Sequence, residues 1–120
     1  MSTRAVDPKR GEIWQVDFNP SVGSEIAKDR PAVVISSDAM GILPVKLVVP
    51  LTEWQDKFGR SPWHVRVEKT PQNGLEKTSA ADTLQTRGVD LMRFVRRRGI
   101  LHAETMEEIA AALAALVEYQ

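Results

Sequence analysis

Residues 31–36 read Pro-Ala-Val-Val-Ile-Ser, and this short apolar run restricts the fold more than any other stretch of the chain. A run of this length with apolar residues on both faces is typical of a strand in the centre of a sheet or barrel. The rest of the chain therefore has to supply neighbouring strands and a cover for both faces.

Three other stretches predict strands around this run. Apolar and polar residues alternate over Glu12–Phe18 and again from Trp63 to Val67, and residues 45–51 form a further apolar stretch. Proline cannot donate a hydrogen bond to a sheet ladder, so Pro50 predicts an edge or a bulge near the end of the strand that contains it.

The second half of the chain predicts shorter elements and one helix. Residues 78–89 mix small and polar side chains and predict one or two short strands, followed by a helical turn over 90–94 and a brief strand over 98–101. Residues 105–108 read Thr-Met-Glu-Glu, which fits a capping box, and apolar residues then recur at three- and four-residue spacing. We expect a helix from about Met106 to the end of the chain.

These elements predict a mainly β protein with α structure, a small and partly closed antiparallel β-barrel plus a C-terminal helix. A chain of 120 residues fits one domain, residues 1–120. No apolar run approaches the roughly 18 residues of a membrane span, and residues 1–8 hold no apolar signal core. We therefore expect a cytoplasmic protein with no membrane association.

Composition narrows the chemistry that the chain can perform. It contains no cysteine, so it offers neither a disulfide nor a thiolate metal site. Two histidines, His64 and His102, are too few for a zinc site on their own. We expect no structural metal and no cofactor.

The charges balance in number but not in position. The 16 basic and 16 acidic residues cancel, which alone argues against a dedicated nucleic-acid-binding protein. Arginines are nevertheless crowded into residues 87–98, whereas the last eighteen residues carry acids and no base. The run Arg96-Arg97-Arg98 fits either a solvated helix face or a basic patch.

A polar loop of both charge signs, residues 19–29, leads directly into the central apolar run. Its length is typical of a functional segment, and Gly23 provides a hinge. Pro31 keeps Arg30 out of the α region, so the arginine should stand at the mouth of the strand on a restricted backbone. Its guanidinium is then a preset anion receptor, and Thr52 should lie at the same rim.

Several blocks are spread in order over nearly the whole chain: Arg10–Phe18, Gly23-Ser24-Glu25 followed by Arg30–Ile35, Val48–Thr52, and Gln85-Thr86-Arg87. Together they resemble the signature of the MazF/PemK toxins. The resemblance implies an SH3-like barrel, also found in the CcdB toxins, and the ribonuclease half of a bacterial toxin–antitoxin pair. It further implies a homodimer and a cognate antitoxin whose disordered, acidic segment folds onto the toxin.

The resemblance places Arg30 and Thr52 at the active site of a sequence-selective endoribonuclease that acts on single-stranded RNA. Cleavage without a metal proceeds by attack of the 2′-hydroxyl on phosphorus and leaves a 2′,3′-cyclic phosphate and a 5′-hydroxyl. Arg30 suits the stabilisation of charge, since its planar fork matches two phosphate oxygens, and Thr52 can donate to the same phosphate. Glu25 is the candidate base, a role that needs burial because burial raises the pKa of a carboxyl group.

Further residues in the loops and in the last block are expected to bind RNA: Gly23, Ser24, Lys28, Trp54, Gln85 and Arg87. Trp54 lies in a polar loop, where it either stacks on an unpaired base or packs at the rim or in a dimer contact. His64 is expected to be a solvated strand residue and His102 a loop residue before the helix. The chain departs from the family pattern at Leu84, where relatives commonly have an acidic residue before the glutamine; Asp82 lies nearby.

Two other functions fit the same residues. A CcdB-like toxin would keep the fold and poison DNA gyrase by binding it, but such toxins depend on a C-terminal Trp-Gly-Ile and this chain ends Glu-Tyr-Gln. A non-catalytic SH3-like module would bind a peptide or nucleic acid without cleaving it. Taken without the resemblance, Arg30 fits a surface ion pair better than a catalytic role.

Overall fold

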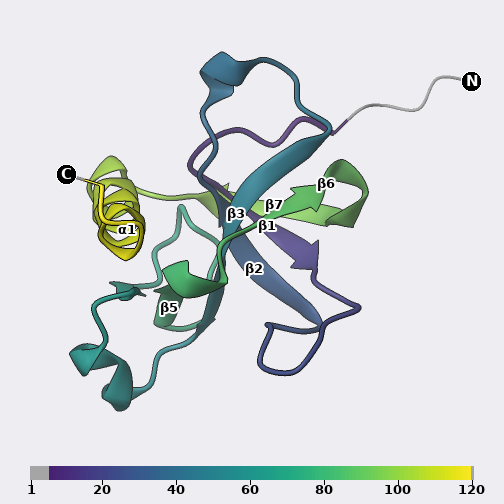
Figure 1. The fold of residues 1–120 in the computed structure, drawn as a ribbon. Coiled ribbons are helices and arrows are strands. Elements are labelled where there is room, and N and C mark those ends of the chain that lie inside the picture. Colours follow the sequence, from purple (N-terminus) through teal and green to yellow (C-terminus); the bar gives the residue numbers. More distant parts are fainter. Residues whose placement is uncertain (1–5, 120) are drawn as a thin grey trace, which may run out of the picture.

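Seven strands, one α-helix and four short 3₁₀ helices form the described part of the chain, residues 6–119 of a computed structural model (Figure 1). The elements in chain order are β1 (Glu12–Asp17), β2 (Asp29–Val34), η1 (Asp38–Met40), β3 (Val45–Glu53), η2 (Asp56–Arg60), β4 (His64–Val67), β5 (Ser79–Asp82), η3 (Thr83–Gln85), β6 (Arg87–Asp90), η4 (Leu91–Arg93), β7 (Phe94–Ile100) and α1 (Ala103–Leu116), where η marks a short 3₁₀ helix.

The strands pair antiparallel in the order β4-β5-β3-β2-β1-β7, with β6 on the first part of β3. The predicted mainly β fold with a C-terminal helix is confirmed. The sheet curls without closing between β4 and β7, so it is barrel-like rather than a complete barrel.

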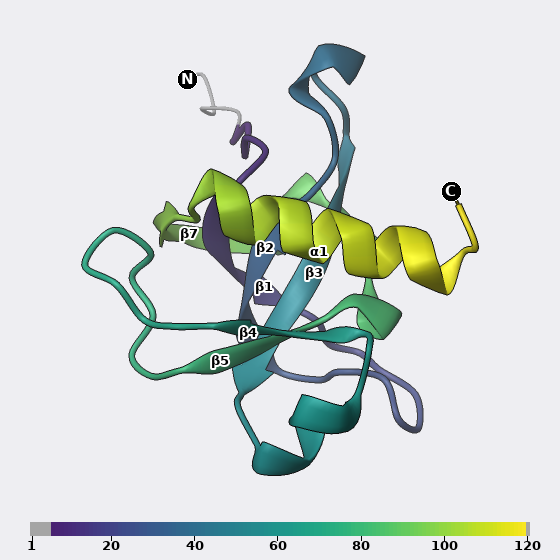
Figure 2. The ribbon, with the colours of Figure 1, turned by 90° about the vertical axis from the view of Figure 1, so that its left-hand side faces the viewer.

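The apolar run of residues 31–36 supplies most of β2, which pairs with β1 on one side and β3 on the other. Val33 packs into one apolar cluster together with Ile109 of α1. Ala32 and Val34 lie in a second cluster on the opposite face of the sheet. Figure 2 shows α1 lying across the strands on the first of these faces. β2 is therefore central and buried on both faces, as predicted.

Strand β3 changes partners along its length. Its first residues pair with β6, Val48–Pro50 pairs with β2, and Leu51–Glu53 pairs with β5. Pairing with β2 ends at Pro50, in keeping with the missing N–H. The strand itself does not end there, and it carries Thr52 onto β5.

Strand β7 is longer than the sequence predicts. The helical turn at Leu91–Arg93 is confirmed, but the strand begins directly after it at Phe94. Residues 96–98 therefore lie in a strand, and the helical-face interpretation of the three arginines is wrong. The stretch lacks the apolar alternation that marks a strand, and its pairing with β1 imposes the extended conformation.

Helix α1 begins before the predicted start at Met106. Its N-cap is His102, which makes no side-chain cap bond, so residues 105–108 lie inside the helix and the capping-box interpretation is wrong. The N–H of Leu101 donates to the carbonyl of Gly11 at 2.9 Å. This bond fixes the chain beside the start of β1 immediately before the helix. The helix begins two residues later, so Thr105 cannot lie in a loop and act as the N-cap.

The buried side of α1 consists of Met106, Ile109 and Ala112. The helix ends at Leu116, and Val117 after it is exposed. The predicted helix, which ran to the end of the chain and had Val117 on its apolar face, is therefore too long. No helix within residues 6–119 has the length and apolar character needed to cross a membrane.

Candidate active site

Arg30 and Thr52 lie on neighbouring strands at the point where the sheet opens. The register pairs Ala32 of β2 with Pro50 of β3, and its continuation would place Arg30 opposite Thr52. At that point β3 has left β2 for β5, where Thr52 pairs with Ala80. The side chains of Arg30 and Thr52 are both half-buried, and both lie in the walls of the same two cavities. The structure therefore brings the predicted pair together.

The Arg30 side chain is held along one edge. Its Nε donates to the carbonyl of Ala27 at 3.1 Å, which anchors the guanidinium to its own loop. Arg30 forms no salt bridge with any residue in the described range 6–119, so the surface ion-pair interpretation does not hold there. A guanidinium that is positioned but not neutralised is suited to bind an anion.

Arg98 is a second cation at this place, which the sequence did not single out. It is the extra residue at a β-bulge of β7 against β1, and a bulge turns a side chain out of the normal alternation. Arg98 donates to Gln15 Oε1 and to the carbonyl of Gly74, each at 2.8 Å. The three consecutive arginines were the available signal, but the bulge that selects one of them is a tertiary feature.

Three cavities surround this part of the molecule, and we name each after one residue. The Arg98 cavity, ≈ 260 Å³, and the His64 cavity, ≈ 520 Å³, both have Arg30 and Thr52 in their walls. The Glu25 cavity, ≈ 390 Å³, shares Gln85 with the His64 cavity. Ligand sites typically measure roughly 300–1,000 Å³, so the His64 cavity is large enough for a nucleotide.

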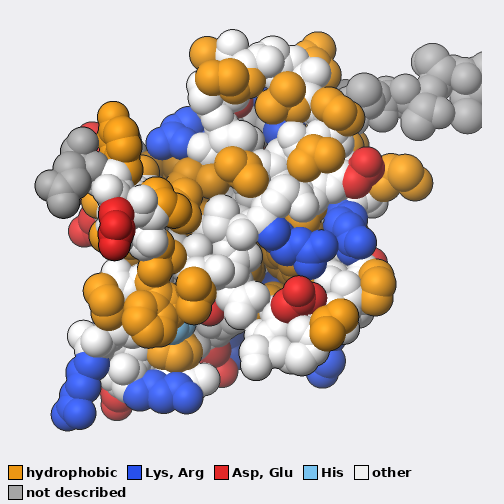
Figure 3. Space-filling model, viewed as in Figure 1, with side chains coloured by type: hydrophobic (Ala, Val, Ile, Leu, Met, Phe, Trp, Pro, Cys, Tyr) orange, Lys and Arg blue, Asp and Glu red, His pale blue; other side chains and the backbone are white. Residues whose placement is uncertain are grey.

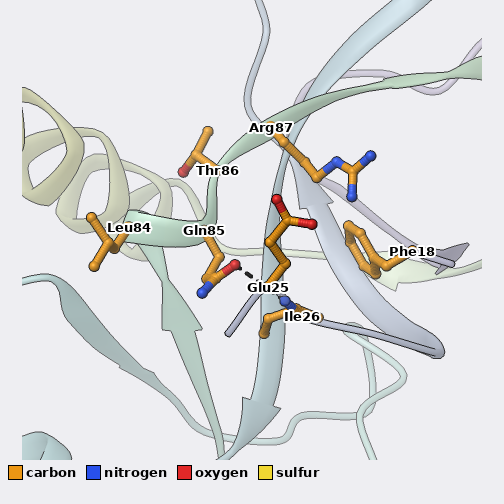
Figure 4. A pocket seen from close by; sticks show the side chains of 7 residues that line it. All are labelled: Phe18, Glu25, Ile26, Leu84, Gln85, Thr86 and Arg87. Carbon is orange, nitrogen blue, oxygen red and sulfur yellow. Dashed lines mark hydrogen bonds between the residues drawn. The ribbon is translucent and has the colours of Figure 1, made fainter. Parts of the chain in front are cut away.

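Gln85 fastens the loop that precedes β2 to η3. Its Oε1 accepts from the backbone N–H of Ile26 at 3.2 Å, and its Nε2 donates to the carbonyl of Ser24 at 3.0 Å. Figure 4 shows the first of these bonds at the wall of the Glu25 cavity. The sequence predicts that Gln85 binds RNA; in the structure its amide holds the loop that leads to Arg30.

Glu25 lines its own cavity rather than the two that contain Arg30. Its Oε1 accepts from the backbone N–H of Val22 at 2.8 Å, and the side chain is exposed. The burial expected of a catalytic base is therefore missing, and the role of Glu25 stays a prediction. Arg87 lines the same cavity, with its guanidinium 5.9 Å from the centre of the Phe18 ring (Figure 4).

The other predicted RNA-binding residues are dispersed. Ser24 lines the His64 cavity, whereas Gly23 and Lys28 are exposed at positions with φ of +58° and +70° in the same loop. Trp54 is half-buried, and its ring meets the edge of Phe58 with centroids 5.9 Å apart. Trp54 is absent from the walls of the three cavities, whereas Phe58 lines the His64 cavity.

His64 is not the solvated strand residue that the sequence predicts, because its side chain is only 9% exposed. Its ring stacks on Phe58 with centroids 3.9 Å apart and planes at 8°, and its Nδ1 lies 2.6 Å from Ser61 Oγ. The side chains of Phe58 in η2 and of Ser61 directly after it therefore cover the imidazole. Period-2 alternation correctly predicts the strand but gives no information on this cover.

Charge at the site is local rather than spread over a basic patch. In the arginine-rich stretch, Arg93 donates to the carbonyl of Asp17 at 3.0 Å, and Arg97 Nε lies 3.0 Å from Glu12 Oε2. On the face shown in Figure 3, basic and acidic side chains lie in small groups among apolar ones. Within residues 6–119 no group of three or more His, Asp or Glu side chains is placed to hold a metal ion.

A clear pKa shift at the start of β1 lies outside the three cavities. Burial raises the pKa of the Glu12 carboxyl, but hydrogen bonds from the Lys9 backbone, the Trp14 indole and Arg97 outweigh it, so the net pKa lies below its usual value. The carboxylate therefore contributes to the stability of the fold in its ionised form.

Known proteins resemble this chain in both sequence and fold. Endoribonuclease MazF9 of Mycobacterium tuberculosis is 35% identical over 111 residues, which cover 88% of this chain and 92% of that protein. A crystal structure of MazF from Deinococcus radiodurans has a TM-score of 0.77 at 22% identity, covering 94% of this chain and 98% of that one. A MazE–MazF structure from the same organism has a TM-score of 0.73 at 20% identity, covering 96% and 100%.

A protein-family model described as the PemK-like, MazF-like toxin of type II toxin–antitoxin systems matches residues 9–117. This match includes every strand, α1 and all three cavities. The chain therefore belongs to the family of PemK-like, MazF-like toxins of type II toxin–antitoxin systems.

Proposed function

We propose that this protein is the toxin of a type II toxin–antitoxin system and acts as an endoribonuclease on single-stranded RNA. The relative named an endoribonuclease, 35% identical, supports the class of activity. The observation that carries the proposal is the placement of Arg30 and Thr52 across the opening between β2 and β3, with the guanidinium free of a carboxylate partner within residues 6–119.

The proposed reaction uses the substrate's own nucleophile. The 2′-oxygen attacks phosphorus and loses its proton to a base, while the bond from phosphorus to the 5′-oxygen breaks and that oxygen takes up a proton. The products are a 2′,3′-cyclic phosphate and a 5′-hydroxyl. Negative charge grows on the phosphoryl oxygens during attack, and Arg30 supplies a fixed positive charge beside them. Thr52 donates a hydrogen bond to the same group, and Glu25 is the proposed base.

We propose that the reaction is metal-independent, because Arg30 and Arg98 place two permanent positive charges at the Arg98 cavity. Cleavage is also proposed to be sequence-selective, since loops and turns form the outer walls of the cavities. The proposed setting is the cytoplasm, with a second copy of the chain as one partner and a cognate antitoxin as the other.

The antitoxin is proposed to compete with RNA for this surface. The family description and the MazE–MazF structure, at 20% identity, support a partner of this kind. A disordered acidic segment would offer carboxylates to the cations that also attract phosphates. Exposed ion pairs contribute only about 0–1 kcal/mol each, so apolar contacts of the antitoxin would supply most of the lasting affinity.

The direct test compares Arg30→Ala with Arg60→Ala. Both remove one positive charge, but Arg60 is exposed on η2 and lines none of the three cavities. Loss of one preorganised charge donor typically lowers the rate about 100- to 1,000-fold, and we expect this for Arg30→Ala while Arg60→Ala cleaves like the parent. Equal rates for Arg30→Ala and the parent would disprove the assigned site.

The chemistry has a separate test on the substrate. Cleavage should persist in excess EDTA and stop when the nucleotide at the cut carries 2′-deoxyribose. Mass spectrometry of the products should find the cyclic phosphate and the 5′-hydroxyl. A 5′-phosphate would reject the attack by the 2′-hydroxyl, and no cleavage of any RNA would reject the proposed activity as a whole.

A further inference from the structure

The His64 ring lines the cavity that also has Arg30 and Thr52 in its wall, and it is held on several sides. Ser61 Oγ lies 2.6 Å from its Nδ1, and the Phe58 ring covers one face with centroids 3.9 Å apart. Asp82 Oδ2 lies 3.6 Å from its Nε2. An imidazole held in this way has little rotational freedom, so it can serve as a rigid wall for a flat ligand.

Asp82 is the group in this cluster whose hydrogen-bonding capacity is not used. Its side chain is 16% exposed, and its Oδ1 is shielded from solvent without a hydrogen-bond partner among the described residues. Its Oδ2 lies slightly beyond hydrogen-bonding distance of His64. A largely buried carboxylate that lacks donors is unfavourable. Oδ1 is closed to solvent and therefore also to a ligand, so an N–H group brought into the cavity would relieve this cost at Oδ2.

The position of Asp82 relates it to the proposed reaction. The His64 cavity, ≈ 520 Å³, has Arg30 and Thr52 in its wall together with Phe58, His64 and Asp82. A phosphate at Arg30 would leave the base of an adjoining nucleotide to fill the rest of this space. Aromatic side chains are common stacking surfaces for unpaired bases, and the half-buried Phe58 ring lies in the wall of this cavity.

We propose that the His64 cavity binds the base of a nucleotide adjoining the scissile phosphate, and that Asp82 selects a base carrying an exocyclic amino group. This inference rests on the proposed endoribonuclease activity and adds a specificity-determining residue to it. The Asp82 carboxylate accepts hydrogen bonds and donates none. Adenine, cytosine and guanine each offer an amino group to such an acceptor, whereas the single N–H of uracil lies between two carbonyls that a carboxylate repels.

The first experiment uses a single-stranded RNA library of random sequence. Parent protein, Asp82→Asn and Asp56→Asn each cleave the library, and sequencing of the new ends gives the bases on either side of the cut. Asp56→Asn is the matched control, because it makes the same change on η2 outside the cavity. We expect the parent to disfavour uracil about tenfold at one position beside the cut. Asn offers both a donor and an acceptor, so Asp82→Asn should accept uracil there while Asp56→Asn keeps the parent pattern.

The second experiment changes the substrate and needs no altered protein to fold. At the selected position the preferred base is replaced by its analogue without the amino group: purine for adenine, inosine for guanine or 2-pyrimidinone for cytosine. The parent should cleave the analogue about tenfold less efficiently, and Asp82→Asn should show a much smaller difference between the two substrates.

The outcomes separate the inference from the proposed function. If the parent cleaves RNA but shows no preference against uracil beside the cut, or if Asp82→Asn keeps the parent pattern, the role of Asp82 is wrong and the activity stands. Equal cleavage of the analogue and the natural base by the parent also overturns it. If the parent cleaves no RNA, the proposed function and this inference fall together.

Discussion

Gln85 accepts a hydrogen bond from the backbone N–H of Ile26 across 59 residues of sequence, and thereby joins the loop before β2 to η3. The same amide also donates a hydrogen bond to the carbonyl of Ser24, so two hydrogen bonds hold the loop to η3. The loop leads into β2 and Arg30, and the Nε of Arg30 is in turn anchored on the carbonyl of Ala27. The position of the Arg30 guanidinium thus depends on a side chain far away in the sequence.

Removal of this amide should loosen the loop. For Gln85→Ala we expect faster amide hydrogen exchange at residues 24–26 and about tenfold slower RNA cleavage, because a small displacement of a positioning group is costly in rate. Gln72→Ala is the control, since Gln72 is an exposed residue outside the three cavities. Unchanged exchange at these amides in Gln85→Ala would show that the loop is held by other contacts.

The Thr52 hydroxyl should matter through its hydrogen bond rather than through its shape. Thr52→Val keeps the branched shape and removes the donor, so cleavage should fall by about tenfold, while Thr52→Ser keeps the donor and should retain most activity. Single-turnover kinetics on one defined RNA would measure both. Equal loss in the two variants would point to packing of the methyl group instead.

The lowered pKa of Glu12 makes part of the stability depend on pH. A carboxylate whose pKa is lower in the folded state stabilises the fold above its unfolded pKa, and this contribution is lost as the pH falls through the folded value. Glu12→Gln should therefore reduce the free energy of unfolding by about 1–2 kcal/mol at pH 7 and by less at pH 3, where part of the contribution of the ionised carboxyl group is already lost. Urea unfolding at the two pH values measures the difference. A pH-independent loss would assign the effect to packing.

The buried amide of Asn73 should be a strong determinant of stability. Its side chain is 2% exposed, donates to the carbonyl of Glu68 at 2.8 Å and accepts from the N–H groups of Thr70 and Leu75. Asn73→Ala leaves these groups without partners and should lower the free energy of unfolding by about 3 kcal/mol. Gln72→Ala, next to it and exposed, should change stability by less than about 0.5 kcal/mol. A near-neutral Asn73→Ala would mean that water replaces the amide.

The parts of the fold that the sequence predicts are those determined by local pattern. The apolar run at residues 31–36 predicts a central strand, and Pro31 with the period-2 strands predicts Arg30 and Thr52 at one rim. Arg98 and His64 were missed as residues of the cavities, because neither side chain is placed by the alternation along its strand. A bulge against β1, which is distant in the sequence, directs the side chain of Arg98. The side chains of Phe58 and Ser61, which lie only six and three residues before His64, cover the imidazole.

The helix start shows the same limit in another form. Residues 105–108 satisfy the pattern of a capping box, yet the hydrogen bond between Leu101 and Gly11 fixes the chain just before the helix, which then begins at Ala103. Local propensity therefore predicted the existence of the helix but not its first residue, because a tertiary contact decided the boundary.

The change of partners along β3 has an evolutionary consequence. The spacing of Arg30 and Thr52 follows from the ladder through Ala32 and Pro50, which lies in the core, whereas loops and turns supply the outer walls of the cavities. Under the proposed function, substitutions in these walls would alter the RNA that is accepted without moving Arg30 and Thr52. Lineages of such toxins would then acquire new targets by single substitutions, each of which leaves the fold and the proposed site intact.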